Sequence, residues 1–254
     1  IGTADDLIIK SKRKTTPNAA HAHTARWLAG LSPPGFRAVR IVSRRVVFPP
    51  RNNWVSRRKY RCADQYIAIS ERVRKSLQRE TFGSVVVSVV YDGVELPALP
   101  TPEERKQARA GFGLPQEAIV LSCLGALERN KGHVAAVEAL PLIRQTLPAH
   151  LLVAGEGPER TLLRQRVRQL GLERTVQLLG QVDDVKAFFA ATDIFLFPAV
   201  DEGLGTALLL AMAYQRPAIA LDSTAAAEVI RDGESGRLIL SAQPGAIEGA
   251  VVYL

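Results

Sequence analysis

Two stretches of the sequence join a predicted buried strand to a helix through a turn that carries glycine and a charged side chain. In residues 124–133 the charged group is Lys131, and in residues 197–213 it is Glu202, which two glycines follow closely. Ligands of open α/β sheets bind at the carboxyl ends of strands, where such turns lie. A helix that begins at glycine presents free backbone N–H groups and the positive end of its dipole, which suits a diphosphate. The two turns therefore predict a phosphate site in which Lys131 meets phosphate oxygens.

Each turn also has a plainer interpretation. The turn at Glu202 fits an ordinary strand-to-helix connection, and a lysine at the start of a helix is more often only solvated. A third turn, residues 152–158, begins like a dinucleotide-binding fingerprint, but Arg160 stands where the third glycine belongs. The sequence therefore lacks the signature of nicotinamide or flavin binding.

The sequence predicts no metal site. Its four histidines and two cysteines are scattered, apart from the pair His21 and His23. Zinc sites use three or four such ligands, so this pair alone carries little weight. Cys62 and Cys123 lie in apolar or strand-like contexts, which favours free thiols in a reducing compartment and hence the cytoplasm.

Short β-branched runs alternate with amphipathic segments, and the strands and helices that they predict must position the turns. Several runs, such as residues 194–197, are apolar throughout, which is typical of strands covered on both faces by helices. The sequence therefore predicts an α/β fold with parallel sheets and right-handed crossovers. The predicted strands are residues 40–46, 65–70, 84–91, 118–125, 150–155, 175–180, 193–198, 216–221 and 237–240, and the predicted helices are residues 70–80, 132–147, 158–170, 183–191 and 205–214.

A boundary is predicted within residues 92–117, where residues 96–102 form a proline-rich linker. We expect two domains, residues 1–96 and residues 97–254. The strands after the boundary suffice for a complete sheet, whereas only three precede it. The first domain is therefore expected to be incomplete, and the absence of an initiator Met suggests that the sequence begins inside a longer product.

The charges are distributed unevenly. Residues 1–80 contain 18 Lys and Arg against 5 Asp and Glu, a net charge of +13, whereas residues 81–254 carry a net charge of −5. The basic part is expected to face an anionic partner: a phospholipid surface, a phosphorylated acceptor or nucleic acid. A solvated basic surface is the plainer alternative. Few aromatic residues interleave with the basic ones and no nucleic-acid motif is present, so we expect no nucleic-acid partner. No run of 18 apolar residues predicts a membrane span.

The order of motifs along residues 18–239 resembles retaining, family-four glycosyltransferases (glycosyl transferases group 1) of the GT-B architecture. Bacterial members that build cell-surface glycans have an acceptor-side domain that is similar to this sequence in residues 21–26, 42–46 and 68–71. The remaining motifs that carry the resemblance are residues 92–95, 125–133, 155–158, 179–185, 193, 202–213, 217 and 228–236.

The resemblance implies two Rossmann-like domains that face a cleft, with an acceptor side in residues 1–96 and a donor side in residues 97–254. It implies transfer of a hexose, with retention, from a nucleoside diphosphate sugar to a glycan or lipid-linked acceptor in cell-envelope polysaccharide or lipopolysaccharide synthesis. No cofactor or metal is expected. The location implied is the cytoplasm, with peripheral binding of residues 1–80 to the inner, anionic face of the plasma membrane.

The resemblance also implies roles for individual residues. Lys131 would bind the donor diphosphate, and Glu202 would contact the transferred sugar. His23, or less favourably His21, would lie across the cleft near the reacting centre. The remaining donor-binding residues implied are Arg129, Gly125, Gly203, Leu204 and Gly205.

Five positions depart from the family pattern, one of them Ala227 in place of the usual Pro. Leu210 stands where a second carboxylate would hold the donor ribose, and Ala126 stands where an Arg is common, a loss for which Arg129 is a substitute. Thr224 and Ala225 replace a glycine pair, so added Cβ atoms would crowd that turn or change its backbone. These departures keep open the alternative of a degenerate relative that binds sugar, nucleotide or a partner without turnover.

Overall fold

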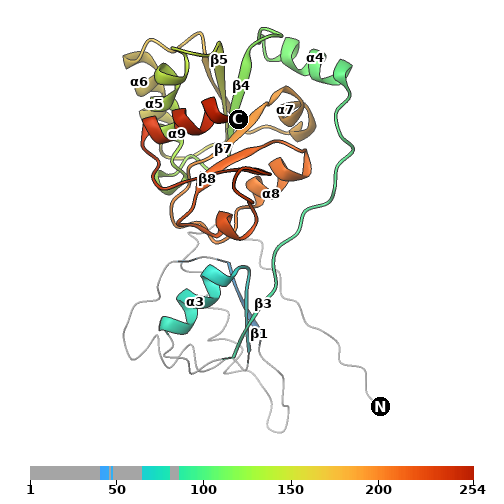
Figure 1. Cartoon of the computed structure of the whole chain (residues 1–254), viewed down its shortest axis with the longest axis vertical. Helices are drawn as coiled ribbons and strands as arrows, with labels where there is room; N and C mark the ends of the chain where they lie inside the picture. The colour runs from blue at the N-terminus through green and yellow to red at the C-terminus, as the bar shows by residue number, and fades with distance from the viewer. Residues whose placement is uncertain (1–40, 46, 48–64, 81–85) are drawn as a thin grey trace.

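The structure is a computed structural model that describes residues 41–45, 47, 65–80 and 86–254. The earlier part of this range forms a three-stranded sheet of β1 (Ile41–Arg44), β2 (Gln65–Ala68) and β3 (Val87–Val89). These strands are parallel and lie in the order β1-β2-β3, with Ile41 opposite Gln65 and Tyr66 opposite Val87. Helix α3 (Glu71–Glu80) follows β2 after a two-residue turn (Figure 1).

The later part forms a six-stranded parallel sheet in the order β6-β5-β4-β7-β8-β9. The chain runs outward from β4 through β5 to β6, then returns to place β7 beside the other edge of β4. Leu121 of β4 therefore lies opposite Leu151 of β5 on one side and opposite Ile194 of β7 on the other. This reversal is a topological switch point, and ligands bind at such points in open α/β sheets. The strands are β4 (Ile119–Leu124), β5 (Ala149–Ala154), β6 (Val176–Gly180), β7 (Ile194–Phe197), β8 (Ala218–Leu221) and β9 (Gly236–Ile239).

Helices cover both faces of the six-stranded sheet (Figure 1). One face packs against α5 (His133–Ile143), α6 (Arg160–Gln169) and α9 (Pro244–Tyr253), and the other against α4 (Pro102–Gly111), α7 (Val185–Ala191) and α8 (Thr206–Ala213). Successive residues of β4 supply the two cores in turn: Val120 belongs to the α7 side, and Leu121 and Cys123 to the α5 side. Burial on both faces explains why the inner strands β7 and β8 are continuous apolar runs.

Each predicted strand is present, and within the described residues its ends differ from the prediction by no more than two positions. The five predicted helices are also present, although α5 ends at Ile143 rather than near Leu147. The proline-rich stretch was predicted as a linker, but α4 begins within it at Pro102. A capping box starts that helix, in which the Thr101 hydroxyl accepts from the Glu104 N–H and the Glu104 carboxylate accepts from the Thr101 N–H. Helix α9 was not predicted either.

A buried ion-pair cluster attaches α4 to the six-stranded sheet. The Arg109 side chain is only 2% exposed, and its guanidinium donates to Asp193 Oδ2 at 2.5 Å and to the Ala118 carbonyl at 3.0 Å. Asp193 also accepts from Arg105 at 2.5 Å and from the Val120 N–H at 2.7 Å. Because the buried charges are paired and hydrogen-bonded, α4 belongs to the same folded unit as β4 and β7.

Cys123 is a free, fully buried thiol, and burial raises its pKa to about 12. It is therefore an inert core residue, as the sequence predicts, while Cys62 lies outside the described residues. In the described part of the chain, no helix has the length and apolar character needed to cross a bilayer.

Candidate functional site

Two loops meet at the carboxyl ends of β4 and β7, at the switch point of the six-stranded sheet. We name residues 125–132 the Lys131 loop and residues 198–205 the Glu202 loop. The Val200 N–H donates to the Asn130 carbonyl at 2.7 Å, which ties one loop to the other. Gly132 has a φ of 71°, and a Cβ there would lie 2.3 Å from the Pro198 carbonyl oxygen. Only glycine fits this contact, so the two loops have a fixed relative position.

The charged side chains of the two loops pair with each other. Lys131 ends a short 3₁₀ helix, Arg129–Lys131, and its ammonium forms an ion pair with the Glu202 carboxylate. The two side chains are 24% and 19% exposed, so the pair is accessible but largely withdrawn from solvent. An ammonium supplies three hydrogen-bond donors for an anion, and a carboxylate accepts hydrogen bonds from hydroxyl groups. The pair thus places a group that can bind an anion beside a group that can accept hydrogen bonds from hydroxyl groups.

Helix α8 begins directly after the Glu202 loop. Its N-cap residue is Gly205, which has no side chain to bond the first helical N–H groups. A Cβ on Gly205 would lie 2.4 Å from the Phe197 ring, and the φ of 90° also requires glycine. The positive end of the helix dipole therefore faces the same region as Lys131 and Glu202, with unfilled donors suited to an anion.

The turn between β2 and α3 covers the remaining part of the Glu202 loop. Leu204 is only 1% exposed and packs with Ile69 and Val73 of this turn and helix. The Ser70 hydroxyl donates to the Gly203 carbonyl at 2.6 Å. No local sequence pattern predicts this contact, because Ser70 and Gly203 lie 133 positions apart along the chain.

The third glycine turn packs closely against the Lys131 loop. A Cβ on Gly155 would lie 1.8 Å from the Gly125 carbonyl oxygen, and a Cβ on Gly157 would lie 2.5 Å from the Leu127 carbonyl oxygen. The backbone of Gly125 therefore packs closely against that of Gly155, and the Gly125 N–H donates to the Ala154 carbonyl at 3.0 Å. These glycines are explained by the close approach of the β4 and β5 turns.

His133, the first residue of α5, lies beneath the Lys131 loop and is only 3% exposed. Burial, with a smaller contribution from the nearby Lys131 charge, lowers its pKa to about 4. The ring is therefore neutral at pH 7, and its Nε2 lies 3.2 Å from the Ala126 carbonyl. Since a carbonyl only accepts, Nε2 carries the proton and Nδ1 remains without a partner.

The positions that depart from the family pattern have ordinary surroundings. Leu210 is half-buried and packs against the core of the α7 side, whereas Ala126 and Arg129 are exposed. Thr224 has a φ of −110°, and its hydroxyl donates to the Leu221 carbonyl at 2.8 Å. Ala225 is fully buried, so the turn that replaces the glycine pair is a packed one without backbone strain.

His21 and His23 lie outside the described residues. Within the ranges that the structure describes, no three His, Cys, Asp or Glu side chains lie close enough together to hold a metal ion.

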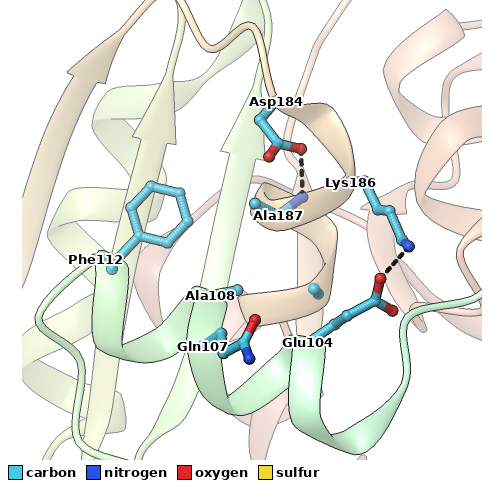
Figure 2. A pocket seen from close by; sticks show the side chains of 9 residues that line it. Glu104, Gln107, Ala108, Phe112, Asp184, Lys186 and Ala187 are labelled. Carbon is cyan, nitrogen blue, oxygen red and sulfur yellow. Dashed lines mark hydrogen bonds and ion pairs between the residues drawn. The ribbon is translucent and has the colours of Figure 1, made fainter.

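A groove of about 500 Å³ lies elsewhere, between α4 and α7 (Figure 2). Its charged groups already have partners: Lys186 pairs with Glu104, and Asp184 accepts from the Ala187 N–H at 2.8 Å. Neither the Lys131 loop nor the Glu202 loop contributes to its lining. The groove is therefore separate from the candidate site.

Residues 118–254 match the family model described as glycosyl transferases group 1. The chain is 31% identical to the putative glycosyltransferase EpsD of Bacillus subtilis, over 55% of this chain and 37% of that protein. It is 32% identical to the phosphatidyl-myo-inositol mannosyltransferase of Mycobacterium leprae (74% and 49%). It is 29% identical to the lipopolysaccharide core biosynthesis mannosyltransferase LpcC of Rhizobium leguminosarum (78% and 55%). The chain thus spans about half, or less, of the length of these curated relatives.

Solved structures give the same fold. Anabaena Alr3699/HepE in complex with UDP and glucose matches 84% of this chain and 61% of its own, with a TM-score of 0.74 and 20% identity. A glycosyltransferase from Rickettsia africae matches 97% of this chain and 73% of its own, with a TM-score of 0.76 and 17% identity. The predicted α/β fold with parallel sheets is confirmed.

Proposed function

The chain belongs to the glycosyl transferases group 1 family, whose fold is of the GT-B type, and we propose that it carries the donor site of a glycosyltransferase that uses a nucleoside diphosphate sugar. The observation that carries this proposal is the Lys131–Glu202 pair at the switch point, next to the glycine-capped start of α8.

The chemistry follows from the charges at this point. When a sugar leaves a nucleoside diphosphate, negative charge develops on the diphosphate as the bond to the anomeric carbon breaks. The Lys131 ammonium and the first N–H groups of α8 are preorganised to stabilise that charge, which lowers the barrier without a metal. Glu202 accepts a hydrogen bond from a sugar hydroxyl and so orients the anomeric carbon.

The acceptor hydroxyl then forms a bond to the anomeric carbon on the face from which the diphosphate leaves, and its proton passes to an oxygen of the departing diphosphate, so the product keeps the configuration of the donor. Retention and the role of His23 across the cleft are part of the proposal and rest on the family resemblance. In this scheme the Lys131–Glu202 ion pair opens on binding, because the ammonium turns to phosphate and the carboxylate to hydroxyl groups. Gly125, Gly203, Leu204 and Gly205 contribute backbone groups, and the exposed Arg129 supplies a second cation in place of the Arg absent at Ala126.

The names of the relatives guide the choice of substrates. The relative from Mycobacterium leprae is a mannosyltransferase acting on phosphatidyl-myo-inositol, and the relative from Rhizobium leguminosarum is a lipopolysaccharide core mannosyltransferase. We therefore propose hexose transfer to a glycan or lipid-linked acceptor in cell-envelope polysaccharide synthesis. The proposed location is cytoplasmic and peripheral, on the inner face of the plasma membrane.

Calorimetric titration with UDP-glucose, UDP-galactose, UDP-N-acetylglucosamine and GDP-mannose tests the proposal, followed by an assay for free nucleotide. We expect one donor to bind with a dissociation constant below about 1 mM, at least 4.1 kcal/mol of binding free energy. We also expect it to release nucleotide slowly, and chelation of metals by EDTA to leave that release unchanged.

Leu210 and the packed Thr224–Ala225 turn motivate the second candidate, a relative that binds without turnover. Binding of a donor with no nucleotide release, even with candidate acceptors present, would support it over catalysis. Absence of binding by every donor would remove the donor site itself.

A further inference from the structure

The Ser70 hydroxyl joins the turn after β2 to the loop that carries Glu202. Ser70 has no exposed surface, and its Oγ donates to the Gly203 carbonyl at 2.6 Å. The same oxygen accepts from the Val73 N–H at 3.2 Å, which makes Ser70 the N-cap of α3. One buried hydroxyl therefore bonds both to the helix and to the residue that follows Glu202.

Glu228 holds this helix start from the six-stranded side. Its two carboxylate oxygens accept from the Glu71 N–H at 2.7 Å and from the Arg72 N–H at 2.8 Å. A carboxylate at a helix N-terminus is also favoured by the helix dipole. Ser70 and Glu228 together satisfy the first N–H groups of α3, so this end of the helix has a fixed position relative to η2 (Ala225–Glu228).

The Glu202 loop depends on outside contacts for its conformation. Asp201 has a φ of 28°, which is rare for a residue with a side chain, and Gly205 has a φ of 90°. Unfavourable backbone conformations persist only where the surroundings enforce them. A Cβ on Gly203 would lie 2.5 Å from the Arg45 carbonyl oxygen, so the loop backbone is pressed against the β1 side of the three-stranded sheet.

We propose that Ser70 is a positioning residue for the transfer reaction: its hydroxyl fixes the Gly203 carbonyl and thereby holds Glu202 toward the sugar. Glu228 supports this role by holding the α3 start on which Ser70 lies. The inference rests on the proposed function of the Lys131–Glu202 site. It assigns to the three-stranded side of the molecule a part in the donor site.

Kinetics of Ser70→Ala tests the catalytic consequence, with nucleotide release from UDP-glucose and GDP-mannose as the readout. We expect kcat to fall about tenfold, because loss of one orienting contact misplaces the reacting groups. The dissociation constant for UDP should change less than about threefold, because the diphosphate is held by Lys131 and α8. Ser70→Thr, which keeps the hydroxyl, should recover much of kcat.

Ser76→Ala is the matched control. Ser76 lies on the same helix, and its hydroxyl also donates to a carbonyl, but to that of Val47 at 3.0 Å and not to one in the Glu202 loop. We expect kcat of Ser76→Ala to equal that of wild type. A double-mutant cycle with Glu202→Gln separates positioning from general destabilisation: once Glu202 is lost, Ser70→Ala should have little further effect on kcat. Independent, multiplicative losses would overturn the proposal.

Hydrogen–deuterium exchange provides a readout that needs no activity. Amide exchange in the peptide covering residues 199–206 should rise in Ser70→Ala and stay unchanged in Ser76→Ala. Unchanged exchange in both variants would overturn the positioning role, whatever the kinetics. If wild type releases no nucleotide, the proposed function fails while the exchange data still decide whether Ser70 orders the loop. If wild type is active and Ser70→Ala is equally active, only the present inference fails.

Discussion

Lys131 is the residue on which the proposed diphosphate site depends most. Its ammonium pairs with Glu202 at the point where the strand order reverses. We expect Lys131→Ala to raise the dissociation constant for UDP about 10- to 100-fold, since a hydrogen bond to a charged group contributes about 1.5–3 kcal/mol. Calorimetric titration of UDP measures the change. Lys186→Ala is the control, because Lys186 pairs with Glu104 in the groove between α4 and α7 (Figure 2) and should leave UDP affinity unchanged. Equal affinities of wild type and Lys131→Ala would exclude Lys131 from the phosphate site.

Leu210 occupies the position where the family pattern places a ribose-binding carboxylate. We expect Leu210→Glu to tighten UDP binding about tenfold by restoring a charge-assisted hydrogen bond. The same change should lower the free energy of unfolding by about 1–3 kcal/mol, since Leu210 is half-buried against an apolar core. Met212→Glu, on the same helix and against the same core, should lower stability without a gain in affinity. If Leu210→Glu only destabilises the protein, Leu210 is a core residue and the ribose is held elsewhere.

At the scale of elements, the Lys131 loop lies against the Glu202 loop through a close backbone contact that only glycine allows at position 132. Gly132→Ala meets two penalties, a φ of 71° and a Pro198 carbonyl oxygen 2.3 Å from the new Cβ. Gly113→Ala meets only the first, because Gly113 has a φ of 63° and no atom within 4 Å of the new Cβ. We expect Gly113→Ala to cost about 1–2 kcal/mol and Gly132→Ala clearly more, with weaker UDP binding. Urea denaturation compares the two variants, and equal costs would mean that the loops separate easily.

The elements that the sequence failed to predict have identifiable physical causes. The Arg109 side chain of α4 is buried and pairs with Asp193. Because an arginine is usually exposed, the sequence does not reveal that this position belongs to the buried face of a helix. The capping box at Thr101 was the remaining signal, and the surrounding prolines masked it. Helix α9 contains Gly245 and Gly249, which lower its helix propensity and weaken its pattern. Strands β7 and β8 were predicted well because burial on both faces makes them apolar throughout.

The candidate site was predictable only in part. Strand-to-helix turns are local, so the sequence identified Lys131 and Glu202 and the glycines beside them. The contacts of Ser70 with Gly203 and of Glu228 with α3 join residues 133 to 157 positions apart. Such contacts follow from the packing of two sheets, which no local pattern encodes. The buried Ala225 and the half-buried Leu210 likewise show their surroundings only in three dimensions.

At the scale of the whole molecule, the burial of His133 makes folding stability depend on pH. Its pKa is about 4 in the folded protein, against an ordinary value of 6.5. At pH 7 both states are neutral at this position. As the pH falls from 6.5 toward 4, only the unfolded chain takes up the proton, so the free energy of unfolding falls by up to about 1.4 kcal/mol per pH unit.

His133→Gln should reduce this pH dependence of the free energy of unfolding, measured by urea denaturation across that range. His150→Gln should change it less, because that ring is less buried. An unchanged slope in His133→Gln would show that the His133 pKa is not depressed.

The whole chain also carries its charges in two opposing parts, a net +13 in residues 1–80 and a net −5 in residues 81–254. A chain with a uniform charge distribution of +8 would attract polyanions only weakly from any direction. We expect this segregation of the charges along the sequence to orient the molecule near an anionic surface, with the acidic part turned away. This property suits an enzyme whose proposed acceptor is lipid-linked, because the donor site would stay on the aqueous side.

Sedimentation with lipid vesicles tests whether charge drives binding of the chain to an anionic surface. The 254-residue chain should bind vesicles rich in phosphatidylglycerol at about 0.05 M salt, since each Lys or Arg near an anionic surface contributes about 1 kcal/mol. Binding should be lost at about 0.5 M salt, where the Debye length falls to roughly 4 Å. Phosphatidylcholine vesicles should not bind, because they carry no net charge. A duplex DNA of random sequence separates a membrane surface from a general polyanion: DNA binding as tight as vesicle binding would favour the nucleic-acid alternative. Equal binding to both kinds of vesicle would show that the basic residues do not drive the interaction.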